Sequence, residues 1–277
     1  MKYKGYGESF RKIREQKHLG LSYFEKIGVN SSNLSKFERG LTMMSFERVD
    51  MMLQEMHITL AEYELILNNF VSGYQEVFLN KIEELDFDND IPNLKILFLE
   101  AQSSGYHLMA LIAKSRIERL RQTELEEIEE YLNKVETWGY FELSLIYFVM
   151  EHLPIKQLTR LFFKFEEKSE NYYNLLKYRK RIFQIAYRIV VIFASNRKRK
   201  MAQYILTIIE SHFKVRIDFY VEVLHLLVLG VMDFCFEEQK KGQKQIYEAL
   251  DLLEKLGDKR LKVFYYKRLK ALLNDFE

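Results

Sequence analysis

The sequence predicts an all-α protein that is organised in two domains. Only two prolines and 11 glycines occur in 277 residues, while leucine, isoleucine, glutamate and lysine recur at helical spacing. This composition favours helices, because strands joined by tight turns need more turn-forming residues. A chain of this length exceeds the usual size of a single domain. We therefore expect one small and one larger helical domain, or two of equal size.

The cysteine content and the apolar segments indicate where the protein works. The single cysteine, Cys235 in "VMDFCF", excludes an intrachain disulfide and a cysteine-rich zinc site, and it fits a reducing compartment. The start, "MKYKGYGESF", lacks the apolar core of a signal peptide, and apolar stretches such as "VLHLLVLGVM" are shorter than a membrane span. We expect a cytoplasmic protein with no membrane partner.

Charge is unevenly distributed along the chain. Residues 1–40 carry nine basic and four acidic side chains, whereas residues 41–100 carry three basic and twelve acidic ones. A basic N-terminal segment fits a polyanionic partner, although a solvated basic surface gives the same count. Charge alone leaves both interpretations open.

Residues 8–70 contain patterns for five short helices. The first, "ESFRKIREQKH", places Phe10 and Ile13 on one side. The second, "SYFEKI", begins with a predicted capping box from Ser22 to Glu25. Helices of this length joined by tight turns predict a compact helical domain.

The third helix, within "NSSNLSKFERG" (30–40), is unusually polar. Asn30 is a good N-cap and Gly40 suits the left-handed turn that follows Arg39. Leu34 and Phe37 lie three residues apart and can dock the helix on a small core. The rest of its surface is left to polar side chains: Ser31, Ser32, Asn33, Ser35, Lys36 and Arg39.

The fourth and fifth helices complete this domain. Ser45 is the predicted N-cap of "FERVDMMLQEMH", and Thr59 with Glu62 forms a capping box before "AEYELILNNF". "FVSGYQEVF" and the acidic "ELDFDNDIPN" then indicate a joint. The predicted organisation is a domain over 1–70, a joint or linker helix over 71–91, and a helical repeat domain over 92–277.

The repeat domain is predicted from internal periodicity. Three polar interruptions, "EHLP" from 151, "ASNR" from 194 and "EEQK" from 237, are spaced by 43 residues, and each separates an apolar helix from a more amphipathic one. Periods of this size indicate stacked helix pairs. Three further helices are expected over 92–137, including one with a predicted capping box from Thr123 to Glu126. We predict an α-solenoid similar to tetratricopeptide (TPR) repeats.

The segment "LSYFEKIGVNSSNLSKFERG" has the pattern of a helix-turn-helix, whose second helix enters the major groove of DNA. The alternative is a surface helical hairpin. The Asn30 cap, the short polar side chains in the first turn, and the basic side chains near the helix end favour DNA binding. Base edges are assigned to Ser31, Ser32, Asn33 and Ser35, and phosphates to Lys36 and Arg39 with Arg11 or Arg14.

Glu38 is an acid within this basic helix, so it needs a structural explanation. We predict that it forms an ion pair with Arg14 of the first helix and ties the two helices together.

These segments carry a family resemblance. "FRKIREQ", "NSSNLSKFERG" and "ITLAEYELIL" resemble the N-terminal domain of the Rgg family of bacterial transcriptional regulators, and "TWGYFELSLIYF" also resembles the family. The resemblance implies a cytoplasmic homodimer whose TPR-like domain binds a short signalling peptide. One departure is Tyr23, which stands where the general helix-turn-helix pattern has glutamine.

Within the repeats, "KYRKRIFQIAYRIVVIF" shows a candidate peptide-binding face. Arg181, Gln184 and Arg188 share one helix face with Tyr178 above them. They form either a solvated polar stripe or part of a concave groove that grips a peptide backbone or carboxylate. The basic run "SNRKRK" (195–200) is interpreted as a solvated loop, with auxiliary DNA or peptide attraction as the alternative.

Catalysis is not indicated. The sequence has no phosphate-cradling glycine loop and no nucleophile elbow, so we predict neither an enzyme nor a cofactor. The six histidines are scattered along the chain, and no two of them stand at metal-ligand spacing. They are His18, His57, His107, His152, His212 and His225. The prediction is a peptide-controlled, DNA-binding transcriptional regulator. The alternative is a protein-interaction scaffold whose N-terminal domain is a docking module.

Overall fold

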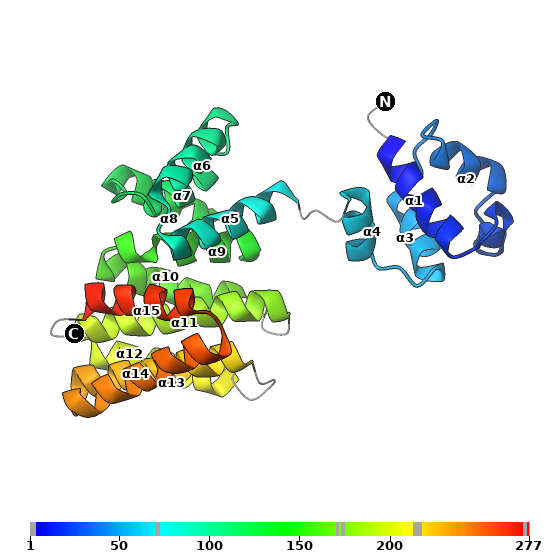
Figure 1. Cartoon of the computed structure of the whole chain (residues 1–277). Coiled ribbons are helices and arrows are strands. Elements are labelled where there is room, and N and C mark those ends of the chain that lie inside the picture. Colours follow the sequence, from blue (N-terminus) through cyan, green and yellow to red (C-terminus); the bar gives the residue numbers. More distant parts are fainter. Residues whose placement is uncertain are drawn as a thin grey trace. The chain divides into compact units, whose positions relative to one another are not determined.

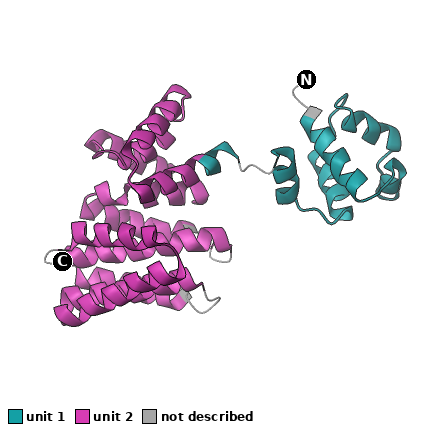
Figure 2. Ribbon diagram, in the orientation of Figure 1, with its two compact units in different colours: residues 1–77 teal, residues 78–277 magenta. Residues whose placement is uncertain are grey.

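A computed structural model describes residues 4–69, 73–169, 172, 175–212, 218–273 and 276. The chain divides into two compact units, residues 1–77 and 78–277 (Figure 2). Every regular element within the described ranges is a helix (Figure 1). The predicted all-α fold is therefore confirmed.

The first unit contains the five short helices expected from the sequence. They are α1 (Lys4–Gln16), the 3₁₀ helix η1 (Leu21–Ile27), α2 (Ser31–Glu38), α3 (Phe46–Glu55) and α4 (Leu60–Leu67). Their apolar faces meet in one small core around Phe10, Phe24 and Phe37. Burial of these aromatic rings supplies much of the apolar area that a unit of this size can remove from water.

Three of the predicted helix ends form as expected. The Asn30 Oδ1 accepts from the backbone N–H of Ser32 at 2.8 Å, and Gly40 has a φ of +68°. The reciprocal capping box between Thr59 and Glu62 is also present. These caps explain why short helices begin and end where the sequence places them.

The start of the second helix differs from the prediction. η1 begins at Leu21 after Gly20, and the Ser22–Glu25 capping box is wrong. The Glu25 carboxylate instead accepts a hydrogen bond from the Ser31 hydroxyl of α2. The acid thus links two helices rather than capping its own.

A glycine permits the close approach of α1 to α2. A Cβ atom on Gly7 would lie 1.9 Å from the Phe37 carbonyl oxygen. No other residue type fits here without moving one of the two helices.

The second unit begins within α5, includes α6 to α8 and continues as helical hairpins. Its first helices are α5 (Tyr74–Asp88), α6 (Ile91–Ser103), α7 (His107–Ser115) and α8 (Gln122–Lys134). The hairpins follow as α9 (Tyr140–Val149) with the 3₁₀ turn η2 (Met150–His152) and α10 (Ile155–Ser169), α11 (Leu176–Ser195) with α12 (Arg199–His212), and α13 (Phe219–Phe236) with α14 (Gln239–Leu256). The chain closes with α15 (Lys259–Leu272), which packs on α14 and α11 (Figure 1). The three hairpins turn at the three polar interruptions, so the predicted helix pairs are confirmed.

The predicted joint is a structural helix. Residues 70–72 lie outside the described residues, and α5 begins at Tyr74. Phe78, Leu79 and Ile82 of α5 are buried in the core of the second unit. The second unit therefore starts within the segment that was predicted to join the domains, at Phe78 rather than at residue 92.

Two further expectations are corrected in this unit. The N-cap of α8 is Arg121, whose backbone N–H donates to Glu124 at 2.8 Å, so the Thr123–Glu126 capping box is wrong. Helix α13 has a mean hydropathy of 1.8 over 18 residues and is long enough to cross a membrane, contrary to the prediction from its apolar stretch. Its burial explains this apolarity, because it packs between α11 and α14. A Cβ on Gly242 of α14 would lie 2.1 Å from the Phe234 nitrogen of α13, which shows how close the two backbones are.

Candidate functional site

Helix α2 presents the polar face that its sequence predicts. Leu34 and Phe37 are fully buried beneath it. The exposed side chains are Ser32, Asn33, Lys36 and Arg39, and Ser31 and Ser35 are partly exposed. The arrangement offers hydrogen-bonding groups near the helix N-terminus and basic groups near its C-terminus, as a DNA-reading helix requires.

Two of these side chains also have contacts within the unit. The Ser31 hydroxyl donates to the Glu25 carboxylate, and Arg39 Nε donates to the Ser35 carbonyl at 3.2 Å. Ser31 therefore helps to hold η1 against α2. Asn33 and Lys36 project from the exposed face between these two contacts.

The orientation of α2 is fixed by a buried ion pair. Arg14 Nε and Nη2 on α1 each donate to one Glu38 carboxylate oxygen at 2.7 Å, and Arg14 Nη1 donates to the Leu19 carbonyl at 2.7 Å. The side chains are only 9% and 5% exposed. The predicted pair is thus formed, and its burial corrects the assignment of Arg14 to phosphate contact.

Arg11 remains available on the outer face of α1. Its Nε donates to Glu15 at 2.7 Å, and both side chains are about half exposed. An exposed pair of this kind is worth little and is readily exchanged for another anion.

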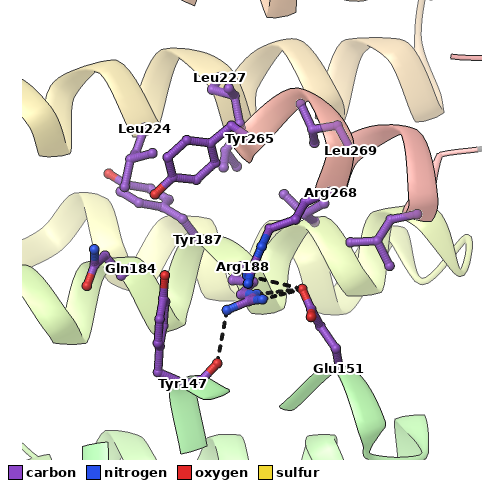
Figure 3. Close-up of a pocket in the computed structure, with 13 residues that line it drawn as sticks. Tyr147, Glu151, Gln184, Tyr187, Arg188, Leu224, Leu227, Tyr265, Arg268 and Leu269 are labelled. Carbon is purple, nitrogen blue, oxygen red and sulfur yellow. Dashed lines mark hydrogen bonds and ion pairs between the residues drawn. The ribbon is translucent and has the colours of Figure 1, made fainter. Parts of the chain in front are cut away.

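The second unit contains a cavity between four segments, named here the repeat cavity (Figure 3). About 50 Å³ of it is wide enough for the centres of water molecules, and the surrounding empty space, part of it open to solvent, amounts to about 490 Å³. α9 with η2, α11, α13 and α15 contribute its lining: Tyr147, Glu151, Gln184, Tyr187, Arg188, Val191, Leu224, Leu227, Val228, Tyr265, Arg268, Leu269 and Leu272.

The repeat cavity has an aliphatic wall and a polar side. Leu224 and Leu227 of α13 lie across the space from the arginines (Figure 3), and Val228 of the same helix also lines the cavity. The Tyr187 side chain is 2% exposed, and its hydroxyl has no hydrogen-bond partner among the described residues. Burial raises the pKa of Tyr187, so this hydroxyl stays protonated and can donate. A buried donor without a partner is costly unless a ligand or water satisfies it.

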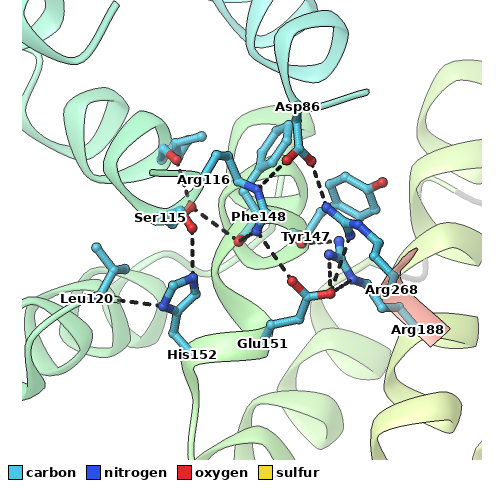
Figure 4. Close-up of polar contacts among 11 residues, drawn as sticks. Asp86, Ser115, Arg116, Leu120, Tyr147, Phe148, Glu151, His152, Arg188 and Arg268 are labelled. Carbon is cyan, nitrogen blue, oxygen red and sulfur yellow. Dashed lines mark hydrogen bonds and ion pairs between the residues drawn. The ribbon is translucent and has the colours of Figure 1, made fainter. Parts of the chain in front are cut away.

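Glu151, Arg188 and Arg268 of the lining belong to a network of three arginines and two carboxylates that Arg116 and Asp86 complete (Figure 4). Arg188 Nε donates to Glu151 at 2.8 Å, and Arg268 Nη2 donates to Asp86 at 2.6 Å. Arg116 donates to both acids, to Asp86 at 3.0 Å and to Glu151 at 3.4 Å. Three cations against two anions leave the network one positive charge in excess.

This network keeps Glu151 ionised. Burial alone would raise the pKa of Glu151, but the neighbouring Arg188 and Arg116 lower it to about 2. Tyr147, whose backbone carbonyl accepts from Arg188 at 3.0 Å, has its own pKa raised to about 12 by burial. The polar side of the repeat cavity is therefore a fixed charged surface at neutral pH.

The comparisons with known proteins decide the family. Residues 93–267 match the family described as "HTH-type transcriptional regulator Rgg, C-terminal domain". The chain belongs to the Rgg family. It is a transcriptional regulator of the helix-turn-helix type.

Solved structures share this Rgg fold at low sequence identity. The Streptococcus dysgalactiae SHP pheromone receptor Rgg2 is 19% identical, with a TM-score of 0.76 over 96% of this chain and 99% of that one. A putative transcriptional regulator from Listeria monocytogenes EGD-e is 18% identical, with a TM-score of 0.81 over 98% and 97%. PrgX in complex with cCF10 is 13% identical, with a TM-score of 0.66 over 98% and 94%.

The structure separates the four predicted peptide-binding residues of this Rgg-family chain. Gln184 and Arg188 line the repeat cavity, whereas Tyr178 and Arg181 do not. Arg181 is 3% exposed, and its Nη2 donates to Glu83 at 2.7 Å. Tyr178 stacks on Tyr172, with ring centroids 4.5 Å apart. The alternative of a solvated stripe is wrong, because Arg181 and Gln184 are buried.

Most residues that line the repeat cavity of this Rgg-family chain were not predicted from the sequence. Glu151 belongs to the "EHLP" interruption, and Arg268 belongs to a basic helix near the C-terminus. The available signal was a lone acid at a repeat boundary and an arginine within an otherwise apolar helix face. Neither reveals its partner, because the partners come from helices far apart in the sequence.

The basic run 195–200 of this Rgg-family chain comprises the end of α11, the turn after it and the start of α12. Arg197 donates to the Cys235 carbonyl, and Arg199 pairs with Glu237, both at the end of α13. Residues 196–200 are exposed. The run is thus a solvated turn, as predicted, and it also joins two successive hairpins.

Proposed function

We propose that this chain binds operator DNA through α2, and that a short peptide bound in the repeat cavity controls this binding. The observation that carries the proposal is the unsatisfied chemistry of the repeat cavity. Its network carries one more positive than negative charge, and the buried Tyr187 hydroxyl has no partner among the described residues. The family consists of transcriptional regulators, so we infer no enzymatic activity.

The DNA contacts follow from exposure and charge. Lys36, Arg39 and Arg11 are exposed and supply phosphate contacts. Ser32 and Asn33 lie in the first turn of α2 and reach base edges, with Ser31 and Ser35 beside them. Arg14 acts through Glu38 by holding the reading helix in place.

The peptide proposal rests on the two sides of the repeat cavity. The leucines and valines from α13 and α11 suit apolar peptide side chains, and the excess arginine charge suits a carboxylate. Structural relatives include a pheromone receptor, a PrgX/cCF10 complex and a bacterial peptide pheromone/receptor complex. We therefore infer a peptide as the ligand class from the chemistry of the cavity lining and from the fold.

We infer that the active form is a cytoplasmic homodimer. A single small DNA-binding unit makes few phosphate contacts, so useful operator affinity needs two copies. Two-fold symmetry then requires half-sites about 34 Å apart, one helical turn, or a multiple of that spacing.

Tyr187→Phe tests the ligand site with a minimal change, because it removes only a hydroxyl that has no partner among the described residues. DNA affinity is measured by fluorescence anisotropy on the protein's own upstream region, with and without peptides below 2 kDa from the culture medium. We expect peptide-free affinity within about twofold of wild type and a peptide response reduced about fivefold or more. Tyr204→Phe, at an exposed side chain outside the cavity lining, is the control. An unchanged response in Tyr187→Phe contradicts the assignment.

A further inference from the structure

Helix α15 contacts two different parts of the second unit. One of its sides supplies Tyr265 and Leu269 to the repeat cavity (Figure 3). From the same helix, the Phe264 ring packs edge-on against Phe87 of α5, with centroids 4.4 Å apart and planes at 76°. α15 therefore forms a cavity wall and also holds the first helix of its unit.

Two ion pairs join α15 to α5, and they differ in burial. Arg268 Nη2 pairs with Asp86 at 2.6 Å, with side chains 16% and 12% exposed. Arg260 pairs with Asp88 at 3.4 Å, with side chains 57% and 42% exposed. The buried pair is screened far less by water and salt, so it carries most of the attraction between the helices.

The Arg268 guanidinium also belongs to the repeat cavity. Its Nη1 donates to Glu151 at 3.4 Å, and its charge lies 4.0 Å from the Phe264 ring centroid. Asp86 does not line the cavity. Arg268 thus divides its hydrogen bonds between an acid inside the cavity and an acid on α5 (Figure 4).

We propose that Arg268 and Phe264 are positioning residues that transmit the state of the repeat cavity to α5. This inference rests on the proposed ligand function of the cavity. A ligand group that draws Arg268 or Glu151 toward itself changes the hydrogen bonds that remain for Asp86. α5 is the next helix after α4 in the chain and begins at Tyr74, so the change reaches the helix that leads to the DNA-binding unit.

The coupling is testable without DNA or peptide, because coupling between two sites is reciprocal. Amide hydrogen exchange is followed in the ligand-free, full-length protein. Asp86→Asn is expected to raise the amide exchange rate across residues 261–272 about fivefold or more. A factor of about five is the lower end of typical coupling between two sites. Asp88→Asn, on the same helix but in the exposed pair, is the matched control and is expected to stay within about twofold of wild type. Equal effects of the two variants would overturn the proposal.

A second experiment perturbs the cavity and measures the effect on α5. Leu227→Phe places a larger side chain in the cavity and so fills part of it. The change is made on α13, which is neither α5 nor α15. We expect exchange in residues 78–88 to rise about threefold or more, and this effect to disappear when Arg268→Gln or Phe264→Leu is added. Exchange in α1 to α4 and in α12 reports the folded state of each variant. Transmission to α5 that persists in the Arg268→Gln and Phe264→Leu backgrounds overturns the proposal, whatever the outcome of the DNA and peptide experiments.

Discussion

Glu38 at the end of α2 accepts hydrogen bonds from Nε and Nη2 of Arg14 on α1, each at 2.7 Å. The geometry is bidentate, and both side chains are nearly inaccessible to water. Because α2 carries the proposed DNA-reading face, this pair determines how that face is presented.

Removing Glu38 should therefore damage the fold of the first unit. Glu38→Ala leaves the Arg14 guanidinium buried without its counter-ion, and we expect a loss of roughly 1–3 kcal/mol in the free energy of unfolding. Urea unfolding of the full chain, with amide exchange in α1 and α2 as the local probe, measures this loss. Glu15→Ala removes the exposed partner of Arg11 and should change the unfolding curve far less than Glu38→Ala does. Equal unfolding curves for Glu38→Ala and wild type would refute the structural role.

The contact between α1 and α2 yields a paired glycine prediction. Gly7→Ala places a Cβ 1.9 Å from the Phe37 carbonyl oxygen, so we expect a loss of about 1–3 kcal/mol from overpacking. At Gly5, in the same helix, the nearest atom to a new Cβ is Leu67 Cδ1 at 3.6 Å. Gly5→Ala should be neutral or stabilising by up to about 1 kcal/mol. If thermal unfolding ranks the two variants the other way, the helices do not pack as described.

Two substitutions on α2 should separate affinity from specificity. Lys36→Ala is expected to weaken binding to all sequences and to lower the slope of log K against log salt by about one. Asn33→Ala should mainly change the preference between operator and unrelated DNA. Anisotropy titrations at several salt concentrations measure both effects. Wild-type operator affinity in both variants would show that α2 does not read DNA.

The histidine at η2 predicts a pH effect on stability. His152 Nδ1 accepts from the Leu120 N–H at 3.2 Å, so Nε2 carries the proton donated to the Ser115 carbonyl at 2.8 Å. Burial lowers the pKa of His152 below its usual value near 6.5. The unfolded chain therefore binds more protons in mildly acidic solution, and stability present above about pH 6.5 is lost as the pH falls toward the lowered pKa.

His152→Gln should reduce this loss, because an amide can accept and donate without titrating. Urea unfolding at about pH 7 and about pH 5.5 compares the two proteins. Burial also lowers the pKa of His225, but this residue is present in both proteins and contributes equally to their pH dependence. Equal losses in stability would show that His152 does not cause the pH dependence.

Local sequence signals predicted the first unit well. The Asn30 cap, the Thr59–Glu62 capping box and the buried Leu34 and Phe37 all arise from residues within a few positions of one another. The three repeat hairpins were likewise predicted, because polar interruptions recur at a fixed period. Such features depend on short-range physics, which a single sequence records directly.

The site in the second unit depends on contacts that the sequence does not encode locally. Arg188 follows a helical pattern that suited either a solvated face or a groove, and only its partner Glu151 decides between them. Arg181 has the same pattern but pairs with Glu83, 98 positions away in the chain. The predicted Ser22–Glu25 and Thr123–Glu126 capping boxes were wrong for a related reason. Glu25 accepts a hydrogen bond from Ser31 of the next helix, and α8 begins at Gln122, before Thr123.

The most direct test of peptide-controlled DNA binding is a salt-resolved anisotropy titration of the full-length protein on its own upstream DNA. It is performed with and without culture peptides below 2 kDa. The account predicts affinity that falls steeply with salt, preference for that DNA over a scrambled duplex, and a shift of about fivefold or more on adding peptides. Binding that shows neither salt dependence nor sequence preference would contradict the account and favour a protein-docking role for the first unit.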